Sequence, residues 1–220
     1  RSNNAGHLIG WRARLALPAT AREFGKRLFG RETPRDARES VDGEADALAM
    51  EGAVPPYAIA NLAVEQVPVS INLPTARLRG NAHGYTAFFT ETFIDELAVR
   101  AAREPLSFRM AMLGHEPRLA ECLQRVAALS GWGGGGDASG QGLACHIIGT
   151  GESAGRIAVV ATARRAETGV RVDRISAVAD IGRIVNLDIA RQQIEGGLIF
   201  GLGLALGSST EYEKGLPTAR

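Results

Sequence analysis

The stretch VADIGRIVNLDIARQQIEGGLIFGLGLAL, residues 178–206, decides how we interpret the rest of the chain. We predict a strand that ends near Asp180, a tight turn at Gly182 and a helix that begins near Asn186. Asn186 is a suitable N-cap, because its side-chain oxygen can accept a hydrogen bond from an otherwise unpaired backbone N–H group. Glycines then occupy positions 196, 197, 201 and 203, and each costs about 1 kcal/mol relative to alanine in a helix. We expect either a ligand or another helix against this backbone, and the residues alone leave both open.

Composition and charge exclude several classes of protein. Apolar residues make up 45% and charged residues 22% of the 220 residues, which is ordinary for a globular protein. The net charge of +1 gives no electrostatic footprint for nucleic acid. Cys122 and Cys145 lie in no CxxC or metal-spaced cluster, so we predict free thiols. The longest apolar run, residues 196–207, is too short to span a bilayer, and we expect no membrane span.

The chain begins at Arg1 without a methionine, so we expect it to be an internal piece of a longer polypeptide. The absence of a targeting signal then says nothing about the compartment.

Periodicity predicts an α+β fold of mixed strands and helices in two subdomains. Residues 1–132 form the first, residues 133–140 a glycine-rich linker and residues 141–220 the second. In the first we predict strands at 7–17 and 62–67 and helices at 84–102, 105–113 and 117–129. In the second we predict strands at 143–148, 156–164, 170–178 and 208–213, with a hairpin turn at 167–169. Charge of both signs is dense over residues 20–51, where we expect a short helix at 21–29 and a solvated loop or surface insertion at residues 31–46.

The stretch TARLRGNAHGYTAFFTETFIDELAVRAA, residues 75–102, is the second informative segment. We expect a strand, a glycine-rich turn and a helix. Gly80 and Gly84 let the backbone of the turn approach a ligand closely, and Arg79 brings five N–H donors to its start. A turn of this kind before a helix N-terminus suits an anionic group. An ordinary connection whose arginine meets a surface carboxylate explains these residues equally well.

The remaining chemistry-bearing side chains give weaker signals. We expect core or surface roles for His7, His115 and His146, whereas His83 lies inside the turn between Gly80 and Gly84 and is a candidate site residue. Glu91 is expected to be buried on its helix, where it either orients the turn or belongs to a local polar network. No GxSxG motif predicts a nucleophilic serine.

Two segments together resemble a known family, the molybdenum hydroxylases of the xanthine dehydrogenase and aldehyde oxidase types. LRGNAHGYTAFFTETFIDELA resembles their Arg-Gly loop and long helix, and residues 178–206 resemble their strand, Gly-Asn turn and glycine-rich helix. The closer similarity is to the large subunit of the isoquinoline 1-oxidoreductase type, where counterparts of PYAIANLAVE, FIDELA and PLSFRMAML follow in this order. The resemblance covers nearly the whole chain except residues 20–50.

The resemblance implies part of the molybdopterin-binding large subunit of an oxidoreductase. Such enzymes hydroxylate an N-heterocycle or oxidise an aldehyde with oxygen from water, and a separate small [2Fe–2S] subunit carries the electrons away. The resemblance places Arg79, Gly80 and Asn81 beside the molybdenum end of the cofactor, which is molybdopterin, possibly in its cytosine dinucleotide form. It makes Gln193 the amide that binds the pterin and makes Gly196 and Gly197 the positions where the helix approaches it. His83 is the candidate for substrate contact.

Departures from the family pattern limit what this chain is expected to do alone. Asn-Ala-His-Gly-Tyr follows the Arg-Gly pair, and Leu187 stands where the family has proline. The glutamate that the family uses as its general base is expected outside these residues, so we predict no catalytic residue here and an inactive fragment. We also predict no metal ligand. The alternative is a non-catalytic binding or scaffold domain that keeps the fold.

Overall fold

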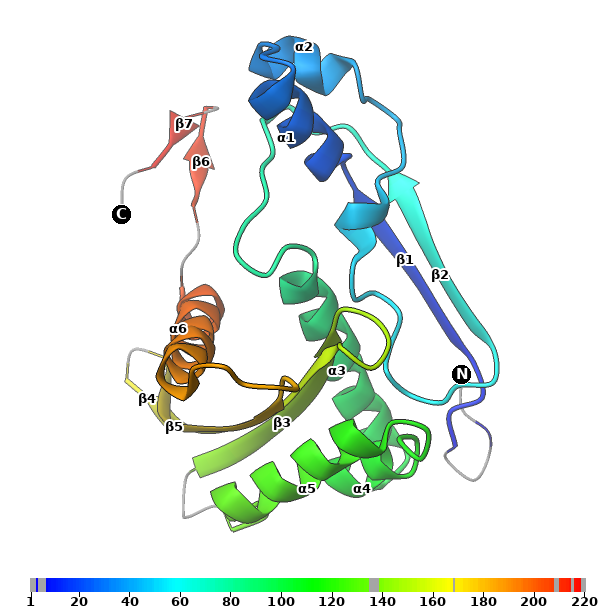
Figure 1. Ribbon diagram of the computed structural model, residues 1–220, viewed down its shortest axis with the longest axis vertical. Coiled ribbons are helices and arrows are strands. Elements are labelled where there is room, and N and C mark those ends of the chain that lie inside the picture. The colour runs from blue at the N-terminus through cyan, green and yellow to red at the C-terminus, as the bar shows by residue number, and fades with distance from the viewer. Residues whose placement is uncertain are drawn as a thin grey trace.

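A computed structural model describes residue 3 and residues 7–134, 139–167, 169–207, 210–214 and 216–218. Groups of helices and groups of strands follow one another along the chain, and the strands form separate small sheets (Figure 1). The predicted α+β class is therefore confirmed.

The N-terminal elements form one end of the molecule (Figure 1). Strand β1 (Trp11–Leu17) pairs in parallel with β2 (Leu62–Pro68), and Trp11 is opposite Leu62. Parallel neighbours require a long crossover connection, and the segment between these two strands supplies it. That segment contains α1 (Thr20–Phe29), α2 (Pro34–Glu39) and the short 3₁₀ helix η1 (Ala47–Met50).

Our expectation of a solvated loop at residues 31–46 is wrong, because this segment contains α2. Thr33 caps α2 by accepting a hydrogen bond from the Asp36 amide at 3.2 Å, and Ala37 is buried beneath this helix. Asp46 is buried too, and its Oδ2 accepts hydrogen bonds from the backbone amide of Ala21 at 2.7 Å. Part of the charge in this segment therefore stabilises helix N-termini instead of facing water.

A three-stranded antiparallel sheet forms the other end of the molecule, in the order β3 (Ser139–Ile148), β4 (Gly155–Ala166) and β5 (Gly169–Asp180). Helix α5 (Pro117–Ser130) packs against β4 and β5, and α3 (His83–Arg100) and α4 (Pro105–Met110) lie beside it (Figure 1). The helices predicted at 84–102, 105–113 and 117–129 and the strands predicted at 143–148, 156–164 and 170–178 are confirmed. The strand predicted before the turn at Gly80 is wrong, because residues 75–79 form neither strand nor helix.

Some boundaries differ from those predicted. Ser139 and Gly140, which we assigned to the linker, begin β3, while linker residues 135–138 lie outside the described residues. Thr168 of the predicted hairpin turn and residues 208–209 of the predicted last strand also lie outside them. The described end of the chain holds the two-residue strands β6 (Tyr212–Glu213) and β7 (Leu216–Pro217).

One hydrophobic core joins residues from both predicted subdomains. Trp11 and Ile94, from before the linker, belong to the same buried cluster as Leu143 and Val160, from after it. The sheet that follows residues 133–140 is covered by helices that precede these residues. The division into two subdomains at residues 133–140 stays a prediction.

A polar network lies inside this core and confirms that Glu91 is buried. Glu91 Oε2 accepts a 3.0 Å hydrogen bond from Arg109 Nε and a 2.9 Å hydrogen bond from the amide of Cys145. Its other oxygen accepts a 2.7 Å hydrogen bond from the hydroxyl of Tyr57. Burial raises the pKa of Glu91 even though Arg109 and these donors oppose the shift. The network connects α3, α4 and β3, so it fixes the wall from which the site is built.

Both cysteines are buried free thiols, as predicted. Burial raises the pKa of Cys145, so this thiol is not a reactive thiolate.

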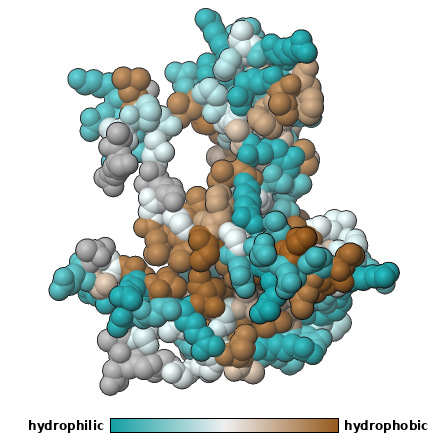
Figure 2. Space-filling view, turned by 60° about the vertical axis from the view of Figure 1, so that its left-hand side comes forward, coloured by the Kyte–Doolittle hydropathy of each residue, from teal (hydrophilic) through white to brown (hydrophobic). Residues whose placement is uncertain are grey.

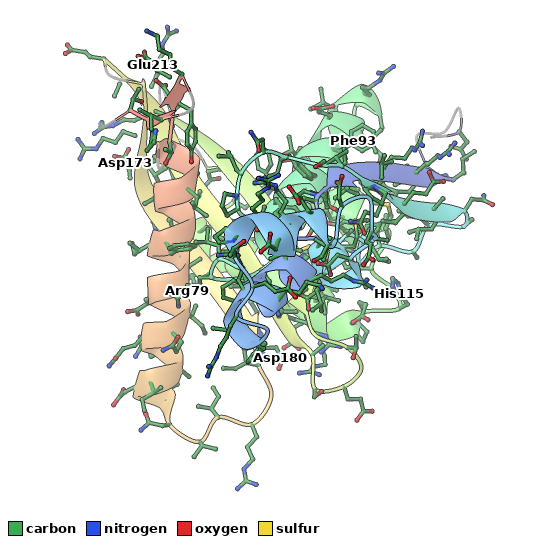
Figure 3. All side chains as sticks on the ribbon, turned by 90° about the horizontal axis from the view of Figure 1, so that it is seen from above. Arg79, Phe93, His115, Asp173, Asp180 and Glu213 are labelled. Carbon is green, nitrogen blue, oxygen red and sulfur yellow. The ribbon has the colours of Figure 1, made fainter. Side chains whose placement is uncertain are left out.

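Helix α6 (Leu187–Leu206) begins at the predicted N-cap, where Asn186 Oδ1 accepts a 3.0 Å hydrogen bond from the amide of Ile189. No residue of α6 is fully buried, and the helix lies beside the sheet (Figures 1 and 3). Asp180 at the end of β5 is clamped by Arg118, with Nε–Oδ2 and Nη2–Oδ1 distances of 2.6 Å. This bidentate pair lowers the pKa of Asp180 to about 2 and fixes the strand end from which α6 departs.

Among the described residues, no helix is both long enough and apolar enough to cross a membrane.

Candidate functional site

A large cavity lies between α6, the sheet and the loop that precedes α3, with a volume of about 1350 Å³. Much of its wall is apolar, including Leu78, Phe88, Ile181 and Leu198. Figure 2 turns the α6 side of the molecule toward the viewer and shows apolar side chains gathered in the middle of that face. A cavity of this size exceeds the roughly 300–1,000 Å³ of a typical small-molecule pocket, so it has room for a large cofactor together with a smaller molecule.

The loop of residues 75–82 is anchored from α1. The buried carboxylate of Glu23 accepts hydrogen bonds from the amide of Thr75 at 3.1 Å, and Arg27 donates to the carbonyl oxygen of the same threonine. The chain then runs to Arg79 and turns into α3. A helix from the N-terminal end thus holds the loop over the cavity.

Arg79 and Gln193 meet at this cavity. Arg79 Nη2 donates to the main-chain oxygen of Gln193 at 2.9 Å and lies 3.4 Å from its side-chain oxygen. Figure 3 shows Arg79 beside α6. Two residues that are 114 positions apart in the sequence are therefore brought together, which is the juxtaposition that the resemblance implies.

The glycines of α6 leave room for the Arg79 side chain. A Cβ atom at Gly196 would lie 3.4 Å from Arg79 Nη1, and one at Gly197 would lie 3.8 Å from Nη2. In this structure the guanidinium group itself lies against the two glycines. We predicted that a pterin approaches the helix at these positions, and this role is untested.

Gly80 and Asn81 form the bend after Arg79. Both have left-handed backbone conformations, with φ of 85° and 49° respectively, which glycine and asparagine tolerate best. Asn81 Oδ1 accepts a 3.0 Å hydrogen bond from Arg77 Nε. The bend turns the chain directly into α3, which begins without a capping side chain.

The polar groups of the cavity wall are cationic or neutral. Three arginines and two histidines are among the described lining residues, and no aspartate or glutamate is. Arg77 pairs with Glu51 and Arg156 pairs with Glu116, both outside the wall. Among the described residues no carboxylate contacts Arg79, so its charge is free to attract an anionic group.

His83 and His146 form a second polar locus in the same cavity. His83 is the first residue of α3 and His146 lies in β3, and His83 Nδ1 is 2.9 Å from His146 Nε2. We assigned His146 a core or surface role, and it is indeed buried, yet it also lines the cavity. The sequence holds no signal for this pair, because the two residues are 63 positions apart and only the packing of α3 on β3 joins them.

Comparison with known proteins agrees with this geometry. Residues 150–220, which include all of β4, β5 and α6, match the family model of the molybdopterin cofactor-binding domain. The chain is 32% identical over 141 residues to the isoquinoline 1-oxidoreductase subunit beta of Brevundimonas diminuta, an alignment that covers 63% of this chain and 18% of that protein.

A second relative is the membrane-bound aldehyde dehydrogenase [pyrroloquinoline-quinone] of Gluconacetobacter polyoxogenes. It is 28% identical over 211 residues, an alignment that covers 83% of this chain and 26% of that protein. The chain thus spans about a quarter or less of the length of these two relatives.

The family-model match identifies residues 150–220 as similar to a molybdopterin cofactor-binding domain, and α6 of this region lines the cavity. These matches support a relationship of this chain to the molybdenum hydroxylase family.

Proposed function

We propose that this chain is part of the large subunit of an oxidoreductase that hydroxylates an N-heterocycle or oxidises an aldehyde, with oxygen from water. The names of the two relatives supply these substrate classes, isoquinoline for one and aldehyde for the other. The observation that carries the proposal is the contact between Arg79 and Gln193 on the wall of one large cavity.

The side chains of the wall fit molybdopterin. Its phosphate needs cationic donors, and Arg79 offers a guanidinium group that no described carboxylate neutralises. Its pterin ring presents donors and acceptors side by side, and the side-chain amide of Gln193 offers both. Gly196 and Gly197 keep side-chain atoms away from that face of α6. The left-handed bend at Gly80 and Asn81 brings main-chain groups to the same end of the cavity.

When bound, the cofactor would supply the two-electron redox chemistry. The work of this chain would be to bind and orient it and to exclude water. Gln193 would hold the pterin edge, and Arg79 would leave its contact with α6 to bind an anionic oxygen. No described carboxylate lines the cavity, so we propose no general base from this wall. A small [2Fe–2S] subunit as electron acceptor and a cytosine dinucleotide form of the cofactor belong to the same proposal.

Two other functions make different predictions. A binding or scaffold domain that has kept the fold would carry no redox cofactor. A quinone-dependent enzyme would carry pyrroloquinoline quinone, the cofactor in the name of the second relative. The cationic cavity suits any flat anionic heterocycle, so a direct assay of the cofactor is needed.

The test is the cofactor content of the protein that contains this chain, produced in a host that makes molybdopterin. Molybdenum is measured by mass spectrometry, pterin by its fluorescent oxidation products, and quinone by enzymatic assay. We expect molybdenum and pterin together and no quinone. Quinone without molybdenum would replace our proposal by the quinone-dependent enzyme, and the absence of all three would favour the scaffold.

A further inference from the structure

The hydrogen-bonded histidine pair forms a second locus in the cavity. Arg79 and Gln193 meet at the α6 wall, whereas His83 and His146 belong to the wall built by α3 and β3. The same two elements also contribute Tyr85, Phe88 and Ile148 to the lining of the cavity. Aromatic and aliphatic side chains of this kind suit a small apolar ligand that carries few polar atoms.

The pair is held tightly from behind. Gly52 has a φ of 75°, and a Cβ atom there would lie 2.5 Å from His83 Nδ1 and 3.0 Å from His146 Cε1. Thr86 is fixed at the same point, because its hydroxyl donates to the carbonyl oxygens of Glu51 and Ala82, each at 2.9 Å. The two rings therefore have little freedom to separate.

The number of protons on the two rings decides which hydrogen-bond donors and acceptors the pair presents to a ligand. His146 is buried, and burial together with the neighbouring His83 lowers its pKa to about 4, so its ring is neutral near pH 7. A neutral imidazole has one N–H donor and one acceptor nitrogen. Either His83 Nδ1–H donates to His146, or His146 Nε2–H donates to His83 Nδ1. In the second arrangement neutral His83 carries its own proton on Nε2.

The outer nitrogen atoms, His83 Nε2 and His146 Nδ1, make no hydrogen bond to any described residue. Neither is among the described buried polar atoms that lack a partner, so each keeps access to solvent or to a ligand. Because both residues line the cavity, a donor or acceptor atom of the pair is available there.

We propose that His146 is a positioning residue, which donates Nε2–H to His83 Nδ1 and so holds His83 in the tautomer whose Nε2–H donates to the substrate. This inference rests on the proposed function. The two substrate classes share one feature, a neutral acceptor atom beside the carbon that is oxidised and no donor of their own. That atom is the ring nitrogen of an N-heterocycle or the carbonyl oxygen of an aldehyde. At His83, only the tautomer with hydrogen on Nε2 complements it.

The test uses the protein with ¹⁵N-labelled histidine rings, without cofactor, so its outcome does not depend on molybdenum content. Ring-nitrogen spectra near pH 7 give the tautomer of each histidine, and isoquinoline and benzaldehyde serve as probes of the two substrate sources. We expect hydrogen on His83 Nε2 in the wild type and a shift of that N–H signal when a probe binds. If isoquinoline alone shifts the signal, the N-heterocycle is the substrate class, and if benzaldehyde alone does, the aldehyde is.

Two variants separate positioning from mere packing. His146→Leu removes the donor to Nδ1 and should mix the His83 tautomers and weaken probe binding about tenfold, the value of roughly one hydrogen bond. His146→Gln restores an N–H donor and should recover most of the wild-type tautomer and affinity. Hydrogen on His83 Nδ1 in the wild type, no shift with either probe, or equal probe affinity in the two variants would overturn the inference. If the protein binds the probes but holds no molybdenum, the inference about the histidine site is supported and the proposed function is contradicted.

Discussion

The guanidinium group of Arg79 donates a 2.9 Å hydrogen bond to the main-chain oxygen of Gln193, 114 residues further along the chain. This contact ties the loop before α3 to the glycine-rich face of α6, across the mouth of a cavity whose described wall contains no carboxylate. A cation held by a neutral carbonyl oxygen is easily released to a stronger acceptor, because hydrogen bonds between charged partners are about twice as strong as neutral ones.

Arg79→Ala should lower the molybdenum and pterin content of the protein at least several-fold, because it removes the free cation of the cavity wall. The thermal unfolding temperature should change little, since Arg79 is exposed and, among the described residues, its hydrogen bonds go to Gln193 alone. Arg125→Ala is the matched control, because Arg125 is exposed on α5 and pairs with Glu121. Equal cofactor content in the two variants would remove Arg79 from the site.

Gly197→Ala should raise stability and lower cofactor content at the same time. Alanine is favoured over glycine in a helix interior by up to about 1 kcal/mol, and the added Cβ meets only the flexible end of Arg79, at 3.8 Å. The cofactor would meet that methyl group directly. Urea unfolding and molybdenum analysis of the same preparation measure both effects. A variant that is more stable and fully loaded would show that no ligand approaches α6 at this position.

The buried pair of Glu91 and Arg109 should be the largest single electrostatic contribution to stability that we can assign. Glu91→Gln removes the buried carboxylate partner of Arg109 and leaves only the partly exposed Asp95, and breaking a buried pair typically costs about 3–5 kcal/mol. Asp95→Asn is the control: Asp95 also bonds Arg109 but its side chain is 42% exposed, so we expect a loss of about 1 kcal/mol or less. Chemical denaturation that ranks the two variants in the opposite order would contradict the role given to the network.

His146 should make the fold less stable in mild acid. The pKa of His146 is about 4 in the folded protein, against 6.5 for a histidine that is not buried. The unfolded chain therefore binds the proton more readily. The free energy of unfolding should therefore fall as the pH drops from about 6.5 to about 4. Below about pH 4, the titration of His146 should cause no further loss of stability. The largest loss is about 3 kcal/mol.

His146→Gln tests this assignment, because it removes the titrating ring and keeps a polar side chain. The difference between the wild type and the variant should shrink or change sign between pH 7 and pH 4, as measured by urea denaturation. A difference that is constant over this range would mean that His146 does not carry the pH dependence.

The sequence predicted the elements of the site better than their assembly. Asn186 predicted where α6 begins, and the glycines of α6 predicted an unusual helix face. The turn at Gly80 predicted a loop whose backbone can approach a ligand closely. Neither segment by itself indicated that the other lies beside it, and the meeting of Arg79 with Gln193 followed from a family resemblance. Local propensity cannot supply such a contact, because it depends on how α1 anchors the loop and how Arg118 fixes the end of β5.

The failures have a similar origin. Asp46 lies in the segment that we predicted to be solvated, and no sequence pattern indicated a role for Glu23; both are buried, where they accept backbone hydrogen bonds. His146 looked like an ordinary strand residue, and its partner is reached only through the packing of α3 on β3. In each case a polar side chain found its partner far along the chain, which composition and periodicity do not record.

The most direct measurement of where the cofactor binds is anomalous X-ray diffraction at the molybdenum absorption edge, on crystals of the loaded protein. We predict a molybdenum peak inside the cavity bounded by Arg79, the Gly80–Asn81 bend and α6, with density for a flat heterocycle against Gln193. A molybdenum peak outside this cavity, with Arg79 still bonded to Gln193 and no ligand between them, would contradict the site proposed for this chain.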